Sequence, residues 1–399
     1  MSVSTKVPVT VLSWFLGAWK TTLLNHILSQ KWDTKVGVIL NDMSEINIDH
    51  MLVDQTGSIS RTDETLVEMS NGCICCTLRE DLLKEVEKLC KQWTYDAIII
   101  ESTWISEPIP VAQTFSYIDE ETWIDLGQWA RLDTMVTVVD ATRFMDDFKS
   151  EEELNDRQLW LGEEDERTIT HLLTDQVEFC DILIVNKRDD IDSAQQKKLL
   201  ALLKALQSSA RVITTNQGKV PINDIVNTWL FDFEIASAWA WWMKELTEEH
   251  IPETEEYGIS SFVYTPQRPF HPQRLWSMLH QERPWVVRGK GFCWLASRPD
   301  AALNWQLAWP HVSLSYWWRR LCTYLDQEVA MMDLEVQEEY VRLRSLEHWG
   351  RITQMVVIGI GHSKEVIKNM LDSCLVTDEE WTQKRDTFDD PFEQIMSLR

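Results

Sequence analysis

Short runs of apolar residues alternate with helical patterns through the first half of the chain, and this alternation predicts its fold. Residues 79–90 and 193–206 have the apolar spacing of helices and would connect successive strands. The strand-like runs are 9–12, 35–40, 96–101, 134–140, 181–186 and, as a weaker candidate, 212–214. Nearly continuous apolar strands separated by helices indicate a parallel sheet with helices on both faces. We therefore predict an α/β domain over residues 1–244.

The pattern changes after residue 244. Residues 245–257 are rich in acidic side chains, contain Pro252 and are predicted to form a linker. Beyond the linker, strand-like and helical segments are mixed, which predicts a smaller α+β C-terminal domain over residues 258–399. The expected strands are 259–264, 291–296 and 354–360, and the expected helical segments are 272–280, 325–348 and 363–370.

The turn after the first strand has part of a phosphate-binding loop. Such a P-loop has the pattern Gly-x-x-x-x-Gly-Lys-Thr between a strand and a helix. Here Lys20 and Thr21 occupy the Lys and Thr positions, and Gly17 supplies one flexible point. The Lys would reach the phosphate oxygens as a catalytic group, and the Thr hydroxyl would hold Mg²⁺. An ordinary strand-to-helix turn with an exposed Lys is the alternative.

Tryptophan occupies both glycine positions of this motif, at Trp14 and Trp19. Glycine serves there because the loop needs unusual dihedral angles and close approach of the backbone to phosphate. A bulky residue at a positive φ costs on the order of 1–3 kcal/mol, and an indole beside the phosphates would also obstruct them. The sequence therefore predicts an impaired nucleotide site.

Two further motifs end buried strands. Asn186-Lys187-Arg188-Asp189 has the pattern Asn-Lys-x-Asp, which suits guanine because a carboxylate can accept hydrogen bonds from both N1–H and the exocyclic amine. Glu101 ends the 96–101 run, where a carboxylate can hold the water shell of Mg²⁺ or orient the attacking water as a catalytic group. A capped strand end is the alternative for Glu101. Trp104 stands where a glycine would let a backbone N–H approach the γ-phosphate.

Three cysteines within one tetrapeptide predict a metal site. Cys73, Cys75 and Cys76 can put two or three thiolates on one ion, and thiolates select Zn²⁺ or Cu(I) over Mg²⁺. A fourth ligand must come from elsewhere, with Glu45, Asp49, a histidine or a partner as candidates. Glu45 lies in a polar stretch, 41–49, that suits a switch region in contact with Mg²⁺ or a transferred metal. Buried structural cysteines at a helix start are the alternative.

Composition limits the classes of partner and the cellular compartment that we expect for this chain. A formal charge of −26 and a sequence pI of about 4.7 argue against nucleic acid or an anionic membrane as the main partner. Eight cysteines in 399 residues, without a signal peptide's apolar core at the N-terminus, favour reduced thiols in the cytoplasm. The chain has 13 Gly and 21 Trp, so tryptophan exceeds glycine, which is the reverse of ordinary usage.

Together these motifs resemble the CobW-type metallochaperone GTPases, and closely the subgroup associated with zinc limitation in bacteria. The resemblance extends over nearly the whole chain and is strongest at 9–13, 20–26, 41–49 and 67–83, with further similar pieces at 101–103, 105–120 and 132–141. It implies a GTPase that uses GTP and Mg²⁺ to deliver Zn²⁺ to client metalloproteins. The family has glycine where this chain has Trp14, Trp19 and Trp104, and also where it has Trp229, Trp241 and Trp309.

The resemblance also assigns roles to residues. It implies that Lys20, Thr21 and Thr22 bind phosphates and Mg²⁺, that Asn186, Lys187 and Asp189 bind guanine, and that Cys73, Cys75 and Cys76 hold the metal. Client zinc metalloproteins are the expected partners, a homodimer is an assembly that the sequence allows, and no nucleic acid or membrane is expected.

Two other functions remain open. One is a nucleotide-independent thiol carrier or sensor of zinc, whose nucleotide site is blocked by tryptophan. The other is a chaperone that inserts cobalt or iron.

Overall fold

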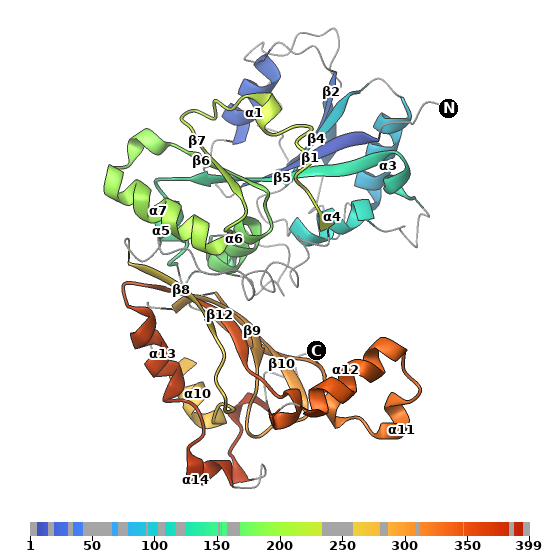
Figure 1. The fold of residues 1–399 in the computed structure, drawn as a ribbon. Helices are drawn as coiled ribbons and strands as arrows, with labels where there is room; N and C mark the ends of the chain where they lie inside the picture. Colours follow the sequence, from blue (N-terminus) through green and yellow to red (C-terminus); the bar gives the residue numbers. More distant parts are fainter. Residues whose placement is uncertain are drawn as a thin grey trace. The chain divides into compact units, whose positions relative to one another are not determined.

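The computed structural model describes residues 6–14, 20–30, 35–42, 66–70, 79–92, 95–102, 108–116, 124–150, 152, 154–157, 168–233, 258–279, 286–308, 311–345, 347–382 and 387–393. The chain divides into two compact units, Met1–Trp241 and Trp242–Arg399. The predicted linker, 245–257, lies outside the described residues. Each unit has its own sheet (Figure 1).

A parallel sheet forms the centre of the first unit, as the apolar runs predict. Its seven described strands lie in the order β3-β2-β4-β1-β5-β6-β7, and every neighbouring pair among them is parallel. The strands are β1 (Val7–Trp14), β2 (Val36–Asp42), β3 (Leu66–Ser70), β4 (Ala97–Glu101), β5 (Ala130–Asp140), β6 (Ile182–Asn186) and β7 (Arg211–Thr214). The weak candidate at 212–214 is thus the edge strand β7, whereas β3 was not predicted.

Helices connect the strands. They are α1 (Lys20–Ser29), α3 (Arg79–Lys91), α4 (Pro108–Ser116), α5 (Phe144–Asp147), α6 (Ile169–Glu178) and α7 (Ser193–Leu206), with 3-10 turns at Leu126–Gln128, Asn155–Arg157, Arg188–Asp190 and Ile222–Asp224. The start of α7 shows why the sequence predicted a helix beginning at residue 193. The Asp192 carboxylate accepts hydrogen bonds from the backbone N–H groups of Ala194 and Gln195, and the Gln195 side chain accepts one from Asp192 N–H. This reciprocal capping box satisfies donors that the first helical turn leaves open.

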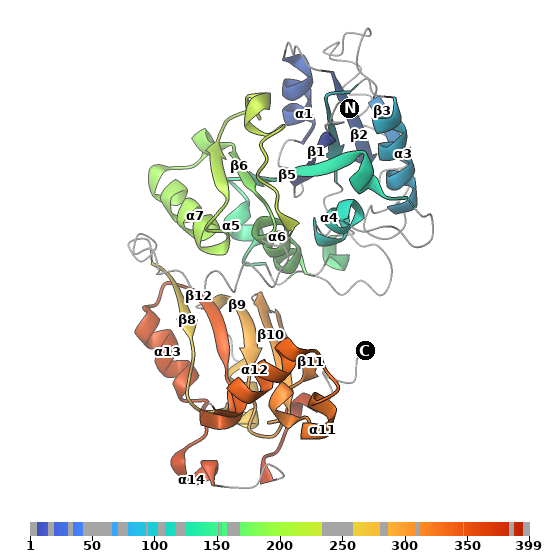
Figure 2. The same ribbon diagram turned by 45° about the vertical axis from the view of Figure 1, so that its right-hand side comes forward.

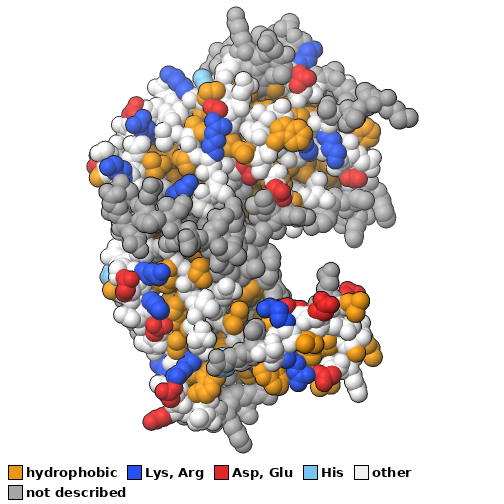
Figure 3. All heavy atoms as spheres, viewed as in Figure 1, with side chains coloured by type: hydrophobic (Ala, Val, Ile, Leu, Met, Phe, Trp, Pro, Cys, Tyr) orange, Lys and Arg blue, Asp and Glu red, His pale blue; other side chains and the backbone are white. Residues whose placement is uncertain are grey.

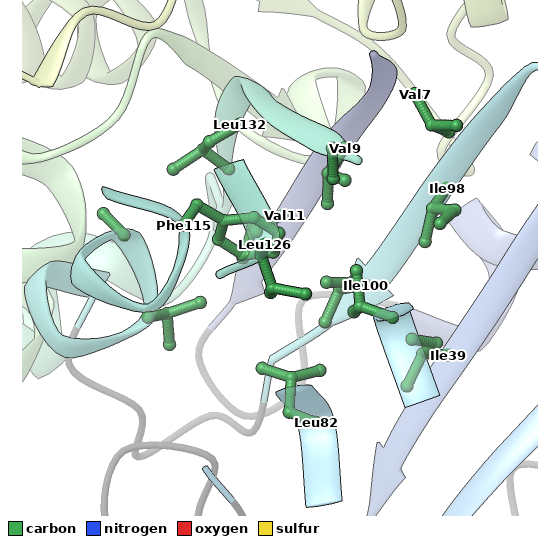
Figure 4. Close-up of a cluster of buried hydrophobic side chains, with 14 of the residues drawn as sticks. Val7, Val9, Val11, Ile39, Leu82, Ile98, Ile100, Phe115, Leu126 and Leu132 are labelled. Carbon is green, nitrogen blue, oxygen red and sulfur yellow. The ribbon is translucent and has the colours of Figure 1, made fainter. Parts of the chain in front are cut away.

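Residues of β1 face two separate cores. Val7, Val9 and Val11 pack with residues of α3 and α4 on one face of the sheet (Figure 4). Leu12 and Trp14 pack with residues of α1 on the other face. Because successive side chains of a strand point to opposite faces, an uninterrupted apolar strand needs helices on both sides. The predicted arrangement of helices on both faces of the sheet is confirmed.

The segment after the last strand returns to the amino-terminal half of β5. The buried Asp133 carboxylate accepts hydrogen bonds from the backbone N–H groups of Thr228 (2.8 Å) and Trp229 (3.0 Å). Arg131 donates to Asn227 Oδ1 at 2.7 Å and stacks its guanidinium 3.4 Å from the centroid of the Trp229 ring. These contacts hold Asn227 and Trp229 at φ values of 55° and 60°. Trp229 is therefore in the left-handed region that favours glycine, the residue that the resemblance gives at this position.

The second unit contains an antiparallel sheet with helices, in agreement with the predicted α+β class. Its five described strands lie in the order β11-β10-β9-β12-β8. They are β8 (Ile259–Tyr264), β9 (Val286–Cys293), β10 (Ala301–Ala308), β11 (His311–Arg319) and β12 (Gln354–Ile360). The helices are α10 (Pro272–Leu279), α11 (Asp326–Val329), α12 (Leu334–Ser345), α13 (Lys364–Asp372) and α14 (Asp378–Trp381), and 3-10 turns lie at Leu321–Thr323, Glu347–Gly350 and Pro391–Glu393 (Figure 2).

Two predictions for this unit are wrong in detail. The strand expected at 291–296 is β9, which begins at Val286 and ends at Cys293. The helical segment expected at 325–348 is two helices, α11 and α12. The Tyr340 hydroxyl bonds the Asp326 carboxylate at 2.7 Å and the Tyr324 carbonyl at 3.1 Å. Because these contacts bring α12 back against the start of α11, the chain must turn between them.

Asp181, just before β6, links the stability of the first unit to pH. Burial raises the pKa of its carboxyl to about 7, and the charge of Asp133 adds to this rise, although the Met135 N–H that donates to it at 2.7 Å opposes it. Between the ordinary pKa of 3.8 and about 7 the folded state holds a proton that the unfolded state has lost. The stabilisation that the Asp181 carboxyl contributes is therefore fully present below pH 3.8 and is lost as pH rises from there through about 7.

We expect Asp181→Asn to remove this loss, since an amide cannot ionise and its oxygen can still accept from Met135 N–H. Relative to the wild-type chain, the variant should gain on the order of 2 kcal/mol of unfolding free energy between pH 5 and pH 8. Urea unfolding followed by circular dichroism at several pH values measures this difference. A difference that stays constant across the pH range would contradict the assignment.

The strain at Trp229 can be separated from its stacking on Arg131 by comparing two substitutions. Trp229→Ala and Trp229→Gly both remove the indole, but only glycine adopts φ 60° without a Cβ clash. The glycine variant should be more stable than the alanine variant by about 1 kcal/mol in urea unfolding. Equal stabilities, or a more stable alanine variant, would show that the backbone there is not strained.

Candidate functional site

Polar residues end three of the four central strands β4, β1, β5 and β6 at one edge of the sheet. Glu101 ends β4, Asp140 ends β5 and Asn186 ends β6, and all three side chains are buried. The strands are parallel, so these carboxyl ends share an edge with the end of β1 at Trp14. From β1 the chain passes to β2, which lies on one side of β1 in the sheet. It later crosses from β4 to β5, which lies on the other side of β1. Ligands of open α/β sheets bind at such a switch point, beyond the carboxyl ends of the strands.

Helix α1 begins six positions after Trp14, the last residue of β1, and packs against that residue. Lys20 is the first residue of α1, and Thr21 and the half-buried Thr22 lie in its first turn. The N-terminus of α1 therefore follows directly from the carboxyl end of β1, which is the place where a P-loop binds phosphate. Gly17 and Trp19 lie outside the described residues, as do the side chains of Lys20 and Thr21.

Glu101 lies at the β1 side of this edge. Its side chain is 1% exposed, and the N–H of the next residue, Ser102, donates to the Leu12 carbonyl at 2.9 Å. Glu101 is the register partner of Leu12, so this residue lies beside the last residues of β1, where a P-loop protein needs a group to orient water or a metal's water shell. Trp104 lies outside the described residues.

Asn186 and Lys187 form the centre of the predicted guanine site. The Asn186 Oδ1 accepts a hydrogen bond from Gly218 N–H at 3.1 Å. Lys187 has a left-handed backbone, φ 58°, and its Nζ lies 2.6 Å from an oxygen of the Asp140 carboxylate. This ion pair holds the ammonium group at the end of β5. The Asn186 side chain fixes the neighbouring loop at Gly218.

Asp189 also contacts the loop of residues 215–219, which contains Gly218. Its side chain is exposed, and its backbone N–H donates to Asn216 Oδ1 at 3.1 Å. The Arg188 N–H donates to the Thr215 carbonyl at 3.3 Å. Residues 215–219, which follow β7, therefore line one side of the segment 186–189. The three predicted guanine residues and this loop come together at the carboxyl edge.

Gly218 fits where another residue would not. Its φ is +64°, and a Cβ on it would lie 2.8 Å from the Cα of Leu23 in α1. The loop that contacts Asn186 is thus packed directly on helix α1. Asp140, Asn216 and Gly218 were not predicted from the sequence. The Asp140 signal was present, since it ends an apolar strand as Glu101 does.

Trp14 does not have the backbone strain that its position in the motif predicted. It is the last residue of β1, is paired with Val138 of β5, and is not among the described residues with positive φ. Its side chain is 2% exposed and packs in the core with Leu23 and Leu24 of α1. The predicted backbone strain at Trp14 is therefore wrong, because an extended strand accepts any side chain.

The predicted metal residues Cys73, Cys75, Cys76 and Glu45 lie outside the described residues. Within the part of the chain that the structure describes, no group of three or more His, Cys, Asp or Glu side chains is arranged to hold a metal ion. The described cysteines Cys90, Cys180, Cys293 and Cys374 form no disulfide bond and are buried, as core residues should be. Burial raises the pKa of the Cys90 thiol to about 12, which makes it a poor nucleophile. None of the described helices is long and apolar enough to cross a membrane.

Residues 8–214, just over half of the chain, match the nucleotide-binding domain of the CobW/HypB/UreG family. The chain belongs to the CobW/HypB/UreG family. Residues 259–375 match the C-terminal domain of the cobalamin synthesis protein CobW, so the family assignment extends to the second unit.

Several relatives of this CobW-family chain have names that refer to zinc. The zinc-regulated GTPase metalloprotein activator 1 of Dictyostelium discoideum is 41% identical over 97% of this chain and 84% of its own length. The zinc chaperone CobW of a Sinorhizobium species is 32% identical over 48% of this chain and 54% of its own length. Among solved structures, the Zn(II)-bound YjiA GTPase from E. coli is 22% identical, with a TM-score of 0.41 over 93% of this chain and all of that one.

The packing of Gly218 on α1 predicts a large effect of one methyl group. Gly218→Ala adds the cost of a left-handed alanine, about 1 kcal/mol, to a steric clash of about 1–3 kcal/mol with Leu23. Gly361→Ala is the matched control, because Gly361 has φ +79° but nothing within 4 Å of its Cβ position. In urea unfolding Gly218→Ala should cost clearly more than Gly361→Ala. If the two cost the same, the loop is not tightly packed on α1.

Proposed function

We propose that this CobW-family protein is a GTPase that binds GTP with Mg²⁺ and uses its hydrolysis to deliver Zn²⁺ to client metalloproteins. The observation that carries the proposal is the segment 186–189 at the carboxyl edge, held by Gly218 and Asp140 beside the phosphate-binding turn. The names of the relatives support zinc as the metal.

Each residue at the edge has a defined task in this proposal. Asp189 accepts hydrogen bonds from guanine N1–H and its exocyclic amine, which selects guanine over adenine. The stem of Lys187 covers the base plane while its ammonium group stays paired with Asp140. Asn186 does not touch the base but positions the loop through Gly218.

At the phosphate end, Lys20 binds the phosphate oxygens at the N-terminus of α1. The buried carboxyl of Glu101 is a hard oxygen donor of the kind that Mg²⁺ and its water shell prefer, and Thr21 supplies a hydroxyl. When bound, Mg²⁺ neutralises charge on the phosphates. Glu101 also orients the attacking water, because its carboxyl lies next to the end of β1.

The topology supports a zinc site beside this edge. β2 ends at Asp42 and β3 ends at Ser70, and these two residues are register partners in parallel strands. Glu45 follows Asp42 by three residues, and Cys73 follows Ser70 by three residues. Both segments therefore start from adjacent points of the carboxyl edge. We propose that Cys73, Cys75 and Cys76 bind Zn²⁺ as cargo with Glu45 nearby, so that nucleotide state and zinc affinity are linked. Cys90, Cys180, Cys293 and Cys374 form no disulfide bond, which suits a reducing compartment such as the cytoplasm.

The test is the affinity for Zn²⁺ of the full chain, measured against a competing chelator with a non-hydrolysable GTP analogue, with GDP and without nucleotide. The affinity should differ between nucleotide states, and Cys73, Cys75 and Cys76 together changed to Ser should abolish tight binding. Asp189→Ala should remove the effect of nucleotide, whereas Asp190→Ala, a change at the adjacent exposed carboxylate, should keep it. Equal zinc affinity in all three states would refute the coupling.

The same preparation separates this function from a nucleotide-independent zinc carrier. Micromolar GTP binding supports the GTPase, and no binding at millimolar GTP supports the carrier. If Trp19 and Trp104 obstruct the site, changing both to Gly should restore binding. Adding Trp14→Gly should bring no further gain, since Trp14 is packed in the core.

A further inference from the structure

A cavity of about 410 Å³ lies in the second unit, between α11, α12 and the end of β11. Its volume is in the range of small-molecule sites. Charged side chains stand beside hydrophobic ones over α11 and α12 in the space-filling view (Figure 3). Three arginines and three aromatic residues line the cavity: Arg319, Arg344, Arg351, Tyr324, Tyr340 and Trp349.

Aromatic rings hold two of the guanidinium groups in place. The Arg344 guanidinium carbon lies 5.3 Å from the centroid of the Tyr340 ring and 5.0 Å from that of the Trp349 ring. Arg319 lies 4.3 Å from the ring centroid of Tyr324. A guanidinium stacked on rings loses little further freedom when it binds a ligand, and its fork of N–H donors suits a phosphate or carboxylate.

The acidic partners of these arginines lie at the rim. Arg344 pairs with Asp326, whose side chain is 78% exposed, and Arg351 pairs with Asp300, which is 51% exposed, whereas Arg351 itself is only 20% exposed. Ion pairs of this exposure contribute only about 0–1 kcal/mol. A ligand with two negative charges can therefore replace the aspartates at little cost. A cavity lined by three arginines and two aspartates is unusual in a chain of net charge −26.

The backbone at the cavity wall is strained. His348 and Trp349 have consecutive left-handed conformations, with φ values of 61° and 57°. Such conformations cost on the order of 1 kcal/mol each and persist at ligand-binding positions. Here the strain places a tryptophan that is 46% exposed over Arg344 at the cavity.

We propose that this cavity binds a purine nucleoside monophosphate, with the phosphate on Arg344 and Arg351 and the purine against Trp349. The arginines supply the anion site, and the exposed indole supplies a stacking surface for a planar ring. The site is separate from the proposed GTP site and is independent of the proposed function. The strong negative charge of the chain disfavours a nucleic acid strand as the ligand.

Titration calorimetry of the full chain with AMP tests the proposal. AMP lacks the guanine and the outer phosphates that the proposed GTP site recognises, and no other nucleotide is added, because GDP carries a purine and a phosphate and would compete for the cavity. The wild-type chain should bind AMP saturably below about 1 mM, and more tightly than adenosine or ribose 5-phosphate, which each carry half of the recognised chemistry. Failure of AMP to bind at 1 mM would overturn the proposal.

Two variants on one helix locate the binding. Arg344→Gln should weaken AMP binding about tenfold, because it removes the stacked guanidinium. Arg342→Gln is the matched control: Arg342 is on α12, 61% exposed and paired with Glu339, and it does not line the cavity. Trp349→Leu provides a second variant and should reduce the advantage of AMP over ribose 5-phosphate. Unchanged melting temperatures confirm folding, and equal effects of Arg344→Gln and Arg342→Gln would overturn the assignment.

Discussion

The parallel pairing of β4, β1, β5 and β6 is the constraint on which the proposed site depends. Each strand is fixed to its neighbour by backbone hydrogen bonds, and the register brings Leu12 opposite Glu101 and Asp140 opposite Asn186. The functional side chains need no long-range recognition of one another, because the sheet places them. Local contacts then refine the positions: Asp140 holds the ammonium group of Lys187, and Asn186 holds the loop at Gly218.

The tryptophans show that backbone conformation decides what a large residue costs. Trp14 lies in an extended strand with helix α1 packed against its ring, and it contributes to the core. Trp229 and Trp349 lie in left-handed turns, and in each case an arginine stacks on the ring. Stacking offsets part of the dihedral cost, which helps the turn to keep its form. An indole in place of glycine is thus tolerated in one setting and strained in another, and motif matching alone does not distinguish the two.

Most strands of the first unit could be predicted from sequence because they are buried and largely apolar. The edge strand β7 is only partly buried and was a weak candidate, and β3, which contains Glu68, was not predicted. β10 of the second unit was not predicted, because Asn304 and Gln306 interrupt it and its residues are buried unevenly along the strand. The positions of Glu101, Asn186 and Asp189 at or just after strand ends could be predicted from motifs, and their roles in binding are the ones proposed above. Asp140 obeys the same rule and could have been found. Gly218 could not be predicted, since its role comes from contact with Leu23 of α1, which is far from it in the sequence.

The contact between Gly218 and α1 also limits how this protein can change over evolutionary time. Within 3.0 Å of a Cβ at position 218 lie the Cα, Cβ and backbone nitrogen of Leu23, and the Cα and nitrogen are present in every amino acid. A smaller residue at 23 therefore cannot act as a suppressor of a larger one at 218. Only a shift of the whole helix would make room, and that shift would displace the start of α1 from the end of β1. Main-chain atoms of residue 23 thus prevent substitution of Gly218, whatever side chain residue 23 carries.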